Sequence, residues 1–191
     1  SQDGLLSLDD PIHRHLPWFS TADPRCAELT LRQLLTHTSG MPDVTDYHWD
    51  KPDASPGALE AYFRSGEIRD MRLLWGPEEG RFSYSNIGYD LLGLVIAAVS
   101  GLSFEAFMET RIFQPMGMEE TSFFTPGRNP ADLVSPHGRN PDKTVSVLAH
   151  YPYTRMHAPS STLTSNLADM GKWAAAHLRR QVLAPDSYDL A

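Results

Sequence analysis

The chain has 191 residues, of which 24 are acidic and 16 basic, and its net charge is -8. No stretch gathers several Lys or Arg side chains as a phosphate-binding surface requires, so we expect no nucleic-acid partner. The longest strongly apolar run, residues 91–99, is far too short to cross a bilayer, so we expect no membrane span. A chain of this length forms either one sizeable domain or a large part of a two-lobed enzyme.

Cysteine content and the first residues give little further information. Cys26 is the sole cysteine, so it forms no internal disulfide and has no cysteine neighbours with which to build a metal site. The opening Ser1-Gln2-Asp3-Gly4 is polar, whereas a secretory signal begins with a basic segment followed by an apolar run. We therefore expect a mature chain or a fragment.

Two helices are predicted in the first third of the chain. Asp9-Asp10-Pro11 favours a turn, and Thr30 can cap a helix that ends before Gly40. Residues 57–65 predict a second helix after an aperiodic loop. The buried positions expected in these helices are Leu31, Leu34, Leu35, Leu59, Tyr62 and Phe63.

A helical hairpin is predicted in the middle of the chain. The clearest periodicity starts after Tyr84 and continues until Gly101. Ser103 can cap the next helix, which Pro115 and Gly117 terminate. The apolar positions that define the two helices are Ile87, Leu91, Leu92, Val95, Ile96, Val99, Phe104, Phe107, Met108 and Ile112.

The last third is predicted to be irregular and then helical. Residues 125–160 are rich in Pro, Gly, Asn and Asp, and residues 144–148 alternate as a short strand does. A final helix starts near Ser165, passes through Leu178 and ends before Pro185. We therefore expect residues 1–191 to form a single, mainly α domain of about six helices with short strands, in which residues 125–160 are an irregular segment.

Three segments in a fixed order carry a family resemblance. They are residues 29–42, which contain His37-Thr38-Ser39-Gly40, residues 82–89, which contain Tyr84-Ser85-Asn86, and residues 158–170. Together they resemble the serine β-lactamase-related superfamily, which includes class C β-lactamases, penicillin-binding-protein-type D-alanyl-D-alanine carboxypeptidases and carboxylesterases of the same fold. Residues 4–11 and 113–118 also match the usual sequence pattern of this family, so the resemblance covers nearly the whole chain.

The resemblance implies a site of three motifs, of which this chain carries one. In the family a serine of Ser-x-x-Lys attacks a carbonyl, the tyrosine of Tyr-x-Asn assists proton transfer, and a Lys-Thr-Gly-like strand closes the site. The resemblance therefore makes Tyr84 and Asn86 the catalytic candidates, with the Asn86 amide able to donate to a substrate carbonyl and to accept from a lysine. Ser85 between them is interpreted as a helix-start residue.

Neither of the other two motifs occurs in these 191 residues. The residues three positions before the three lysines are His48, Asn140 and Asp169, so there is no Ser-x-x-Lys. Lys143-Thr144-Val145 lacks the glycine of the third motif and precedes the Ser165 helix rather than following it. The resemblance places the nucleophile just before the start of the chain and the closing strand after its end, so we expect a fragment.

These observations predict a fold and a reaction class. The expected fold is the helical lobe of an α+β enzyme whose sheet, contributed by both chain ends, is largely missing. The parent protein is then expected to be a serine hydrolase of β-lactams, D-Ala-D-Ala-type peptides or esters that needs no metal or organic cofactor. A phenol has a pKa of ~10 and takes up a serine proton at neutral pH only when nearby cations favour the phenolate. The family's two motif lysines supply those cations and neither is present here, so we expect the chain alone to be inactive. The alternative is a non-catalytic binding or interaction module on the same scaffold.

Other candidates for chemistry have simpler interpretations. Ser39 and His37 lie too close along one helical end to be assumed to face each other, so this stretch is interpreted as structural. The eight histidines show no metal-ligand spacing and are expected at the surface or in loops, including the pair His150 and His157. By their position in the family, the loops that carry Trp49, Tyr151 and Tyr153 are expected at the mouth of a substrate cleft, and the alternative is that these aromatic side chains only pack.

The remaining expectations concern partners and localisation. A helical face that normally packs on the missing sheet would be exposed, which predicts self-association or marginal stability. The resemblance leaves the localisation open between the periplasm or cell envelope and the cytoplasm.

Overall fold

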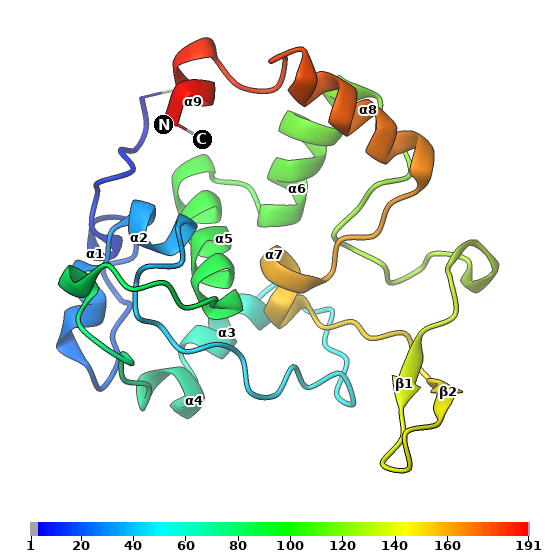
Figure 1. The fold of residues 1–191 in the computed structure, drawn as a ribbon, viewed down its shortest axis with the longest axis horizontal. Helices are drawn as coiled ribbons and strands as arrows, with labels where there is room; N and C mark the ends of the chain where they lie inside the picture. Colours follow the sequence, from blue (N-terminus) through cyan, green and yellow to red (C-terminus); the bar gives the residue numbers. More distant parts are fainter. Residues whose placement is uncertain (1–3, 191) are drawn as a thin grey trace.

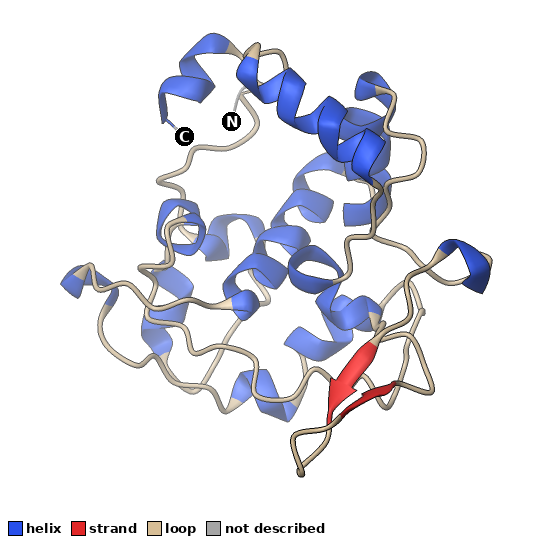
Figure 2. Ribbon diagram, turned by 45° about the vertical axis from the view of Figure 1, so that its right-hand side comes forward, coloured by secondary structure: helices blue, strands red, loops and turns tan. Residues whose placement is uncertain are grey.

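The structure, a computed structural model, describes residues 4–190. Over this range it is mainly helical, with nine α-helices, several 3-10 segments, one π-helical turn and one two-stranded sheet (Figure 2). The predicted fold class of a mainly α chain with short strands is confirmed. More helices are present than the six expected, because several are single turns that leave no period in the sequence.

Four short helices come from residues 12–69: α1 (Ile12–His15), α2 (Leu31–Leu35), α3 (Ala58–Phe63) and α4 (Gly66–Arg69). Thr30 caps α2 as predicted, since its hydroxyl accepts from the backbone N–H of Gln33 at 3.3 Å while the Gln33 side chain accepts from the Thr30 N–H at 3.0 Å. This reciprocal capping box satisfies two backbone donors that the helix leaves free.

The long helix α5 (Asn86–Ser100) lies at the centre of the molecule (Figure 1). Its cap is Ser85, whose hydroxyl accepts from the N–H of Gly88 at 3.1 Å, and Gly101 ends it in the left-handed conformation at φ 72°. The predicted hairpin partner is α6 (Phe104–Met108), which is capped by Ser103 and continues through the π turn Glu109–Phe113 and the 3-10 turn Gln114–Met116.

The buried apolar side chains form two clusters. The larger cluster joins α1 to α5, and the smaller one lies where α6 and the following turns meet Phe123 and Trp173. The fully or almost fully buried members include Ile12, Leu29, Leu31, Leu34, Met41, Phe63, Ile68, Leu91 and Val95 in the first cluster, and Phe104, Phe113 and Met118 in the second.

The short helix α7 (Ala158–Ser161) packs directly on α5 (Figure 1). Gly93 permits this close approach, because a Cβ atom at that position would lie only 2.2 Å from Cγ of Pro159. The approach brings a segment from late in the chain against the first half of α5, where the predicted site residues lie.

A hairpin formed by β1 (His137–Arg139) and β2 (Val145–Val147) projects away from the helices (Figure 1). The strand predicted over residues 144–148 is thus present, and its partner β1 gave no signal in the sequence. Lys143 lies in the exposed turn of this hairpin with a φ of 71°. The structure therefore gives no functional role to Lys143-Thr144-Val145.

The last two helices are α8 (Leu167–Leu178) and α9 (Pro185–Leu190). α8 is anchored by Asp169, which accepts from the Glu120 N–H at 2.9 Å and the Thr121 hydroxyl at 3.0 Å. Another face of α8 is exposed to solvent. An exposed stripe of apolar side chains follows it, formed by Leu167, Met170, Ala174 and Leu178, and Leu167 and Leu178 are 90% and 86% exposed.

Within residues 4–190, no single helix is long and apolar enough to span a membrane. Only α5 and the segment that follows it reach the required length and composition together, and they are bent by 75°.

Candidate functional site

The two candidates Tyr84 and Asn86 are brought together at the N-terminus of α5. The Tyr84 hydroxyl donates to Oδ1 of Asn86 at 3.2 Å, across the capping residue Ser85. Tyr84 is 55% exposed, whereas Ser85 and Asn86 are buried. The hydrogen bond fixes the position of the phenol oxygen, while more than half of the Tyr84 residue is exposed.

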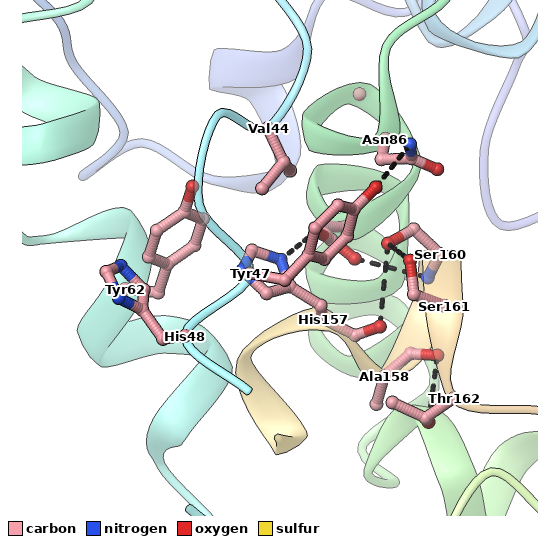
Figure 3. Close-up of polar contacts among 12 residues, drawn as sticks. Val44, Tyr47, His48, Tyr62, Asn86, His157, Ala158, Ser160, Ser161 and Thr162 are labelled. Carbon is pink, nitrogen blue, oxygen red and sulfur yellow. Dashed lines mark hydrogen bonds and ion pairs between the residues drawn. The ribbon is translucent and has the colours of Figure 1, made fainter. Parts of the chain in front are cut away.

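The orientation of the Asn86 amide is fixed by its neighbours. Nδ2 donates to Oδ1 of Asp43 at 3.1 Å and to the Tyr47 hydroxyl at 2.7 Å, and the Asn86 backbone N–H also donates to Asp43, at 2.7 Å. Because an ionised carboxylate only accepts, the atom facing Asp43 must be the amide nitrogen. Both amide N–H groups are thus used within the protein, as Figure 3 shows for Tyr47. The oxygen, which accepts from Tyr84, can accept one further hydrogen bond.

His37 forms the support beneath Tyr84. Its ring lies 4.5 Å from the Tyr84 ring and 5.0 Å from that of Tyr89, and its Nδ1 accepts from the backbone N–H of Ser85 at 3.2 Å. Burial lowers the pKa of His37, which favours the neutral ring with its proton on Nε2. The structural interpretation of this segment agrees with these contacts, and the buried Ser39 hydroxyl accepts from the Met41 N–H at 3.2 Å.

A buried ionisable pair lies one turn further along α5. Asp90 and His157 are both fully buried, and Oδ2 of Asp90 lies 2.7 Å from Nδ1 of His157. Oδ1 of Asp90 accepts from the backbone N–H of Ser160 at 3.2 Å, so one carboxylate joins two points of the α7 segment to α5. Burial raises the pKa of Asp90, and the hydrogen bond from His157 opposes that rise.

The expectation that the histidines lie at the surface or in loops is wrong for His157, which is fully buried, and for His15, whose side chain is 8% exposed beside Asp10. A signal was available for His157. Asp90 is an acidic residue four positions after Asn86, within an otherwise apolar helix, and a buried carboxylate needs a partner.

Aromatic rings surround this pair. The edge of His157 meets Tyr47 at 5.1 Å and Tyr62 at 4.7 Å between ring centroids, and Tyr47 stacks on Trp49 at 4.9 Å with an angle of 7° between the planes. Trp49, one of the loop aromatics expected at the cleft mouth, therefore lies next to Tyr47, which accepts from Asn86. Tyr153, another such candidate, is buried against Phe124.

The described residues also hold one group of possible metal ligands. Asp46, His48 and Asp50 each have a ligand atom within 4.8 Å of the others. His48 is already paired with Glu67 at 3.2 Å and the aspartates are exposed, so we assign no ion to this group.

Comparison with known proteins identifies the family. The family model described as Beta-lactamase matches residues 1–191. The chain belongs to the beta-lactamase family. The superfamily resemblance carried by the Tyr84-Ser85-Asn86 segment is thereby confirmed.

Individual members of the beta-lactamase family share sequence and fold with this chain. A penicillin-binding protein of Bacillus subtilis (strain 168) is 36% identical over 129 residues, which are 64% of this chain and 26% of that protein. The solved structure of a penicillin-binding protein from Bacillus halodurans has a TM-score of 0.79 and 27% identity, and covers 98% of this chain and 57% of that one. An octameric penicillin-binding protein homologue from Pyrococcus abyssi has a TM-score of 0.77 and 26% identity, over 98% and 43% of the two chains.

These beta-lactamase-family relatives are longer than the chain. It spans about a quarter of the Bacillus subtilis protein and about half of the two solved structures. Its mainly helical fold together with this partial coverage agrees with the expected helical lobe of the two-lobed fold.

Proposed function

We propose that the protein to which these 191 residues belong is a serine hydrolase that forms an acyl-enzyme, and that Tyr84 is its proton-transfer residue. The observation that carries the proposal is the hydrogen bond from the exposed Tyr84 hydroxyl to Oδ1 of Asn86 at the start of α5. This contact fixes the position of the phenol oxygen on a residue that is more than half exposed, as a group that exchanges protons with a substrate must be.

The proposed reaction runs in two steps. A serine oxygen from a Ser-x-x-Lys motif attacks the substrate carbonyl carbon while the serine proton passes to Tyr84 in its phenolate form. The bond from that carbon to the leaving amine or alkoxide then breaks, and Tyr84 gives the proton to the leaving group. Water afterwards cleaves the ester that links the acyl group to serine. Tyr84 needs nearby cations to act as a base at neutral pH, and the motif lysines of the family fill that role. Nothing in the sequence calls for a metal or an organic cofactor.

The chain by itself is proposed to be inactive. It contains no Ser-x-x-Lys, so no nucleophile activated by a motif lysine is present beside Tyr84. The substrate of the longer protein is an amide or ester carbonyl, and β-lactams, D-Ala-D-Ala-type peptides and simple esters all belong to this class.

The test is turnover of nitrocefin and of p-nitrophenyl acetate by a protein that includes the residues encoded directly before Ser1 and after Ala191. Turnover by the unaltered protein, and a loss of at least ~100-fold in kcat/KM on Tyr84→Phe, are the expected results. Tyr188→Phe on α9 removes a hydroxyl that accepts only from the Val182 N–H, so this control keeps full activity. Equal activity of Tyr84→Phe and the unaltered protein would contradict the proposal.

A non-catalytic binding module is the second candidate, because the sequence carries the Tyr-x-Asn motif without a nucleophile. The coding sequence directly upstream distinguishes the two. A Ser-x-x-Lys there supports the hydrolase, and its absence supports the binding module.

We further propose that the isolated chain self-associates through the exposed stripe of α8. Four apolar side chains on one helix face are open to solvent, and the burial of such a face is favourable. A second copy is the proposed occupant, in line with the octameric assembly named for the Pyrococcus abyssi homologue.

A further inference from the structure

Asn86 has no amide proton left for a ligand. Its two Nδ2 protons go to Asp43 and Tyr47, and its backbone proton also goes to Asp43. A carbonyl oxygen placed beside Asn86 would therefore meet only the amide oxygen, which repels it. A hydrogen-bond donor other than Asn86 is needed if the site binds a carbonyl compound.

The Tyr47 hydroxyl is placed to be that donor. Its oxygen accepts from Asn86 at 2.7 Å, so its own proton must point in another direction. Burial raises the pKa of Tyr47, which keeps the hydroxyl protonated at neutral pH, and the nearby Ser161 hydroxyl opposes that rise. Ser161 lies on the exposed end of α7, next to Tyr47 in Figure 3. The Tyr47 hydroxyl accepts from the Asn86 amide, so its own proton is available to a ligand oxygen.

The ring that carries this hydroxyl is rigidly held. One face stacks on Trp49, and the ring also contacts the edge of His157, which Asp90 fixes from below. Figure 3 shows Tyr47 between His157 and Asn86, with its hydroxyl at the Asn86 end. A donor fixed before binding loses little conformational freedom when a ligand arrives.

We propose that Tyr47 is the ligand-facing hydrogen-bond donor of the Tyr84 and Asn86 site, and that the site takes an amide or ester carbonyl whose aryl substituent lies against the Tyr47 and Trp49 rings. The carbonyl lies beside the Asn86 oxygen without contacting it and accepts from Tyr47. The stacked aromatic pair supplies the apolar surface for the substituent. This inference rests on the proposed function in placing an acyl compound at the site, and it concerns binding rather than hydrolysis.

The test is a titration of the ¹⁵N-labelled 191-residue chain with N-benzylacetamide. NMR spectra of the backbone and side-chain N–H groups monitor the binding. The expected result is a saturable shift of the Trp49 indole and Asn86 amide signals. On Tyr47→Phe, which keeps the ring and removes the donor, the Kd should rise about 5- to 10-fold.

Tyr62→Phe is the matched control, because Tyr62 contacts the same His157 ring while its hydroxyl donates to Glu67 at 3.0 Å. This variant should bind like the unaltered chain. The inference is overturned by an unchanged Kd in Tyr47→Phe, by equal weakening in both variants, or by the absence of shifts at Trp49 and Asn86.

Binding and chemistry fail separately in this design. The chain carries no Ser-x-x-Lys, so the titration reports binding alone. Intact Tyr47-dependent binding together with no turnover by the longer protein would defeat the proposed hydrolase function and leave the role of Tyr47 standing.

Discussion

Nδ1 of His157 lies 2.7 Å from Oδ2 of Asp90, and neither side chain has any exposed surface. The two residues are 67 positions apart in the chain, and their contact joins the α7 segment to the helix that begins at Asn86. The buried pair therefore holds together the two segments between which Tyr47 lies.

Removing one member of this pair should cost much of the stability of the chain. Asp90→Ala leaves the buried His157 ring and the partly buried Ser160 N–H without an acceptor. Loss of one partner of a buried pair costs about 3–5 kcal/mol. The free energy of unfolding from urea titration measures this. The exposed pair of Glu60 and Arg64 on α3 is the control, and Glu60→Ala should change stability by less than ~0.5 kcal/mol. Equal effects of the two substitutions would contradict the structure.

Acid should weaken the fold through Asp23. The Arg25 guanidinium, which donates to Asp23 at 2.7 and 2.9 Å, together with the Leu73 N–H holds the pKa of Asp23 far below its ordinary value. Because the folded pKa lies below the unfolded value of about 3.9, the stabilisation is complete above that pH and is lost as the pH falls.

Unfolding free energies measured between pH 6 and pH 2.5 test this expectation. Asp23→Asn should lower the free energy of unfolding at pH 6 and should make its decrease with falling pH less steep. The control Asp132→Asn, at an exposed position, should leave both unchanged. A slope that is the same in Asp23→Asn and in the unaltered chain would rule out Asp23 as the acid-sensitive group.

The local features of the sequence were predictable, and the contacts that complete the site were not. Thr30, Ser85 and Ser103 signalled helix starts by their type and position, and each accepts from a backbone N–H at the start of its helix. Tyr84 and Asn86 are two residues apart, so their proximity needed no tertiary information.

Asp43, Tyr47 and His157 come from outside α5, and no local period encodes their contacts. Asp43 reaches Asn86 across 43 positions and Tyr47 across 39, from a loop whose composition favours no regular element. The single turns α4 and α9 were missed for a related reason, since four to six residues are too few to establish a helical repeat.

Two helical glycines should respond in opposite ways to the same substitution. Gly93→Ala forces a methyl group into Pro159 and should destabilise the chain by about 1–3 kcal/mol. Gly171→Ala on α8 meets no atom within 4 Å and should stabilise it by roughly 0.5–1 kcal/mol. Thermal unfolding followed by circular dichroism compares them, and a stabilised Gly93→Ala would show that α7 does not pack on α5 as described.

The exposed stripe of α8 should control association of the isolated chain. Replacing Leu167 and Leu178 together by Gln removes the two most exposed apolar side chains of the stripe without touching the buried clusters. Sedimentation velocity should show oligomers of the unaltered chain that disappear in the double variant. If the unaltered chain stays monomeric at ~100 μM, the proposal is contradicted, because an apolar face of this kind should associate at that concentration.

The most direct test of the central claim, that Tyr84 and Asn86 belong to an acyl-transfer site whose nucleophile lies outside these residues, is intact-mass spectrometry after incubation with a β-lactam or an activated ester. We predict no acyl adduct on the 191-residue chain, and one adduct per molecule on a protein that also contains the preceding Ser-x-x-Lys. An adduct on the 191-residue chain that disappears with Tyr84→Phe would contradict this account, because the chain would then hold its own nucleophile.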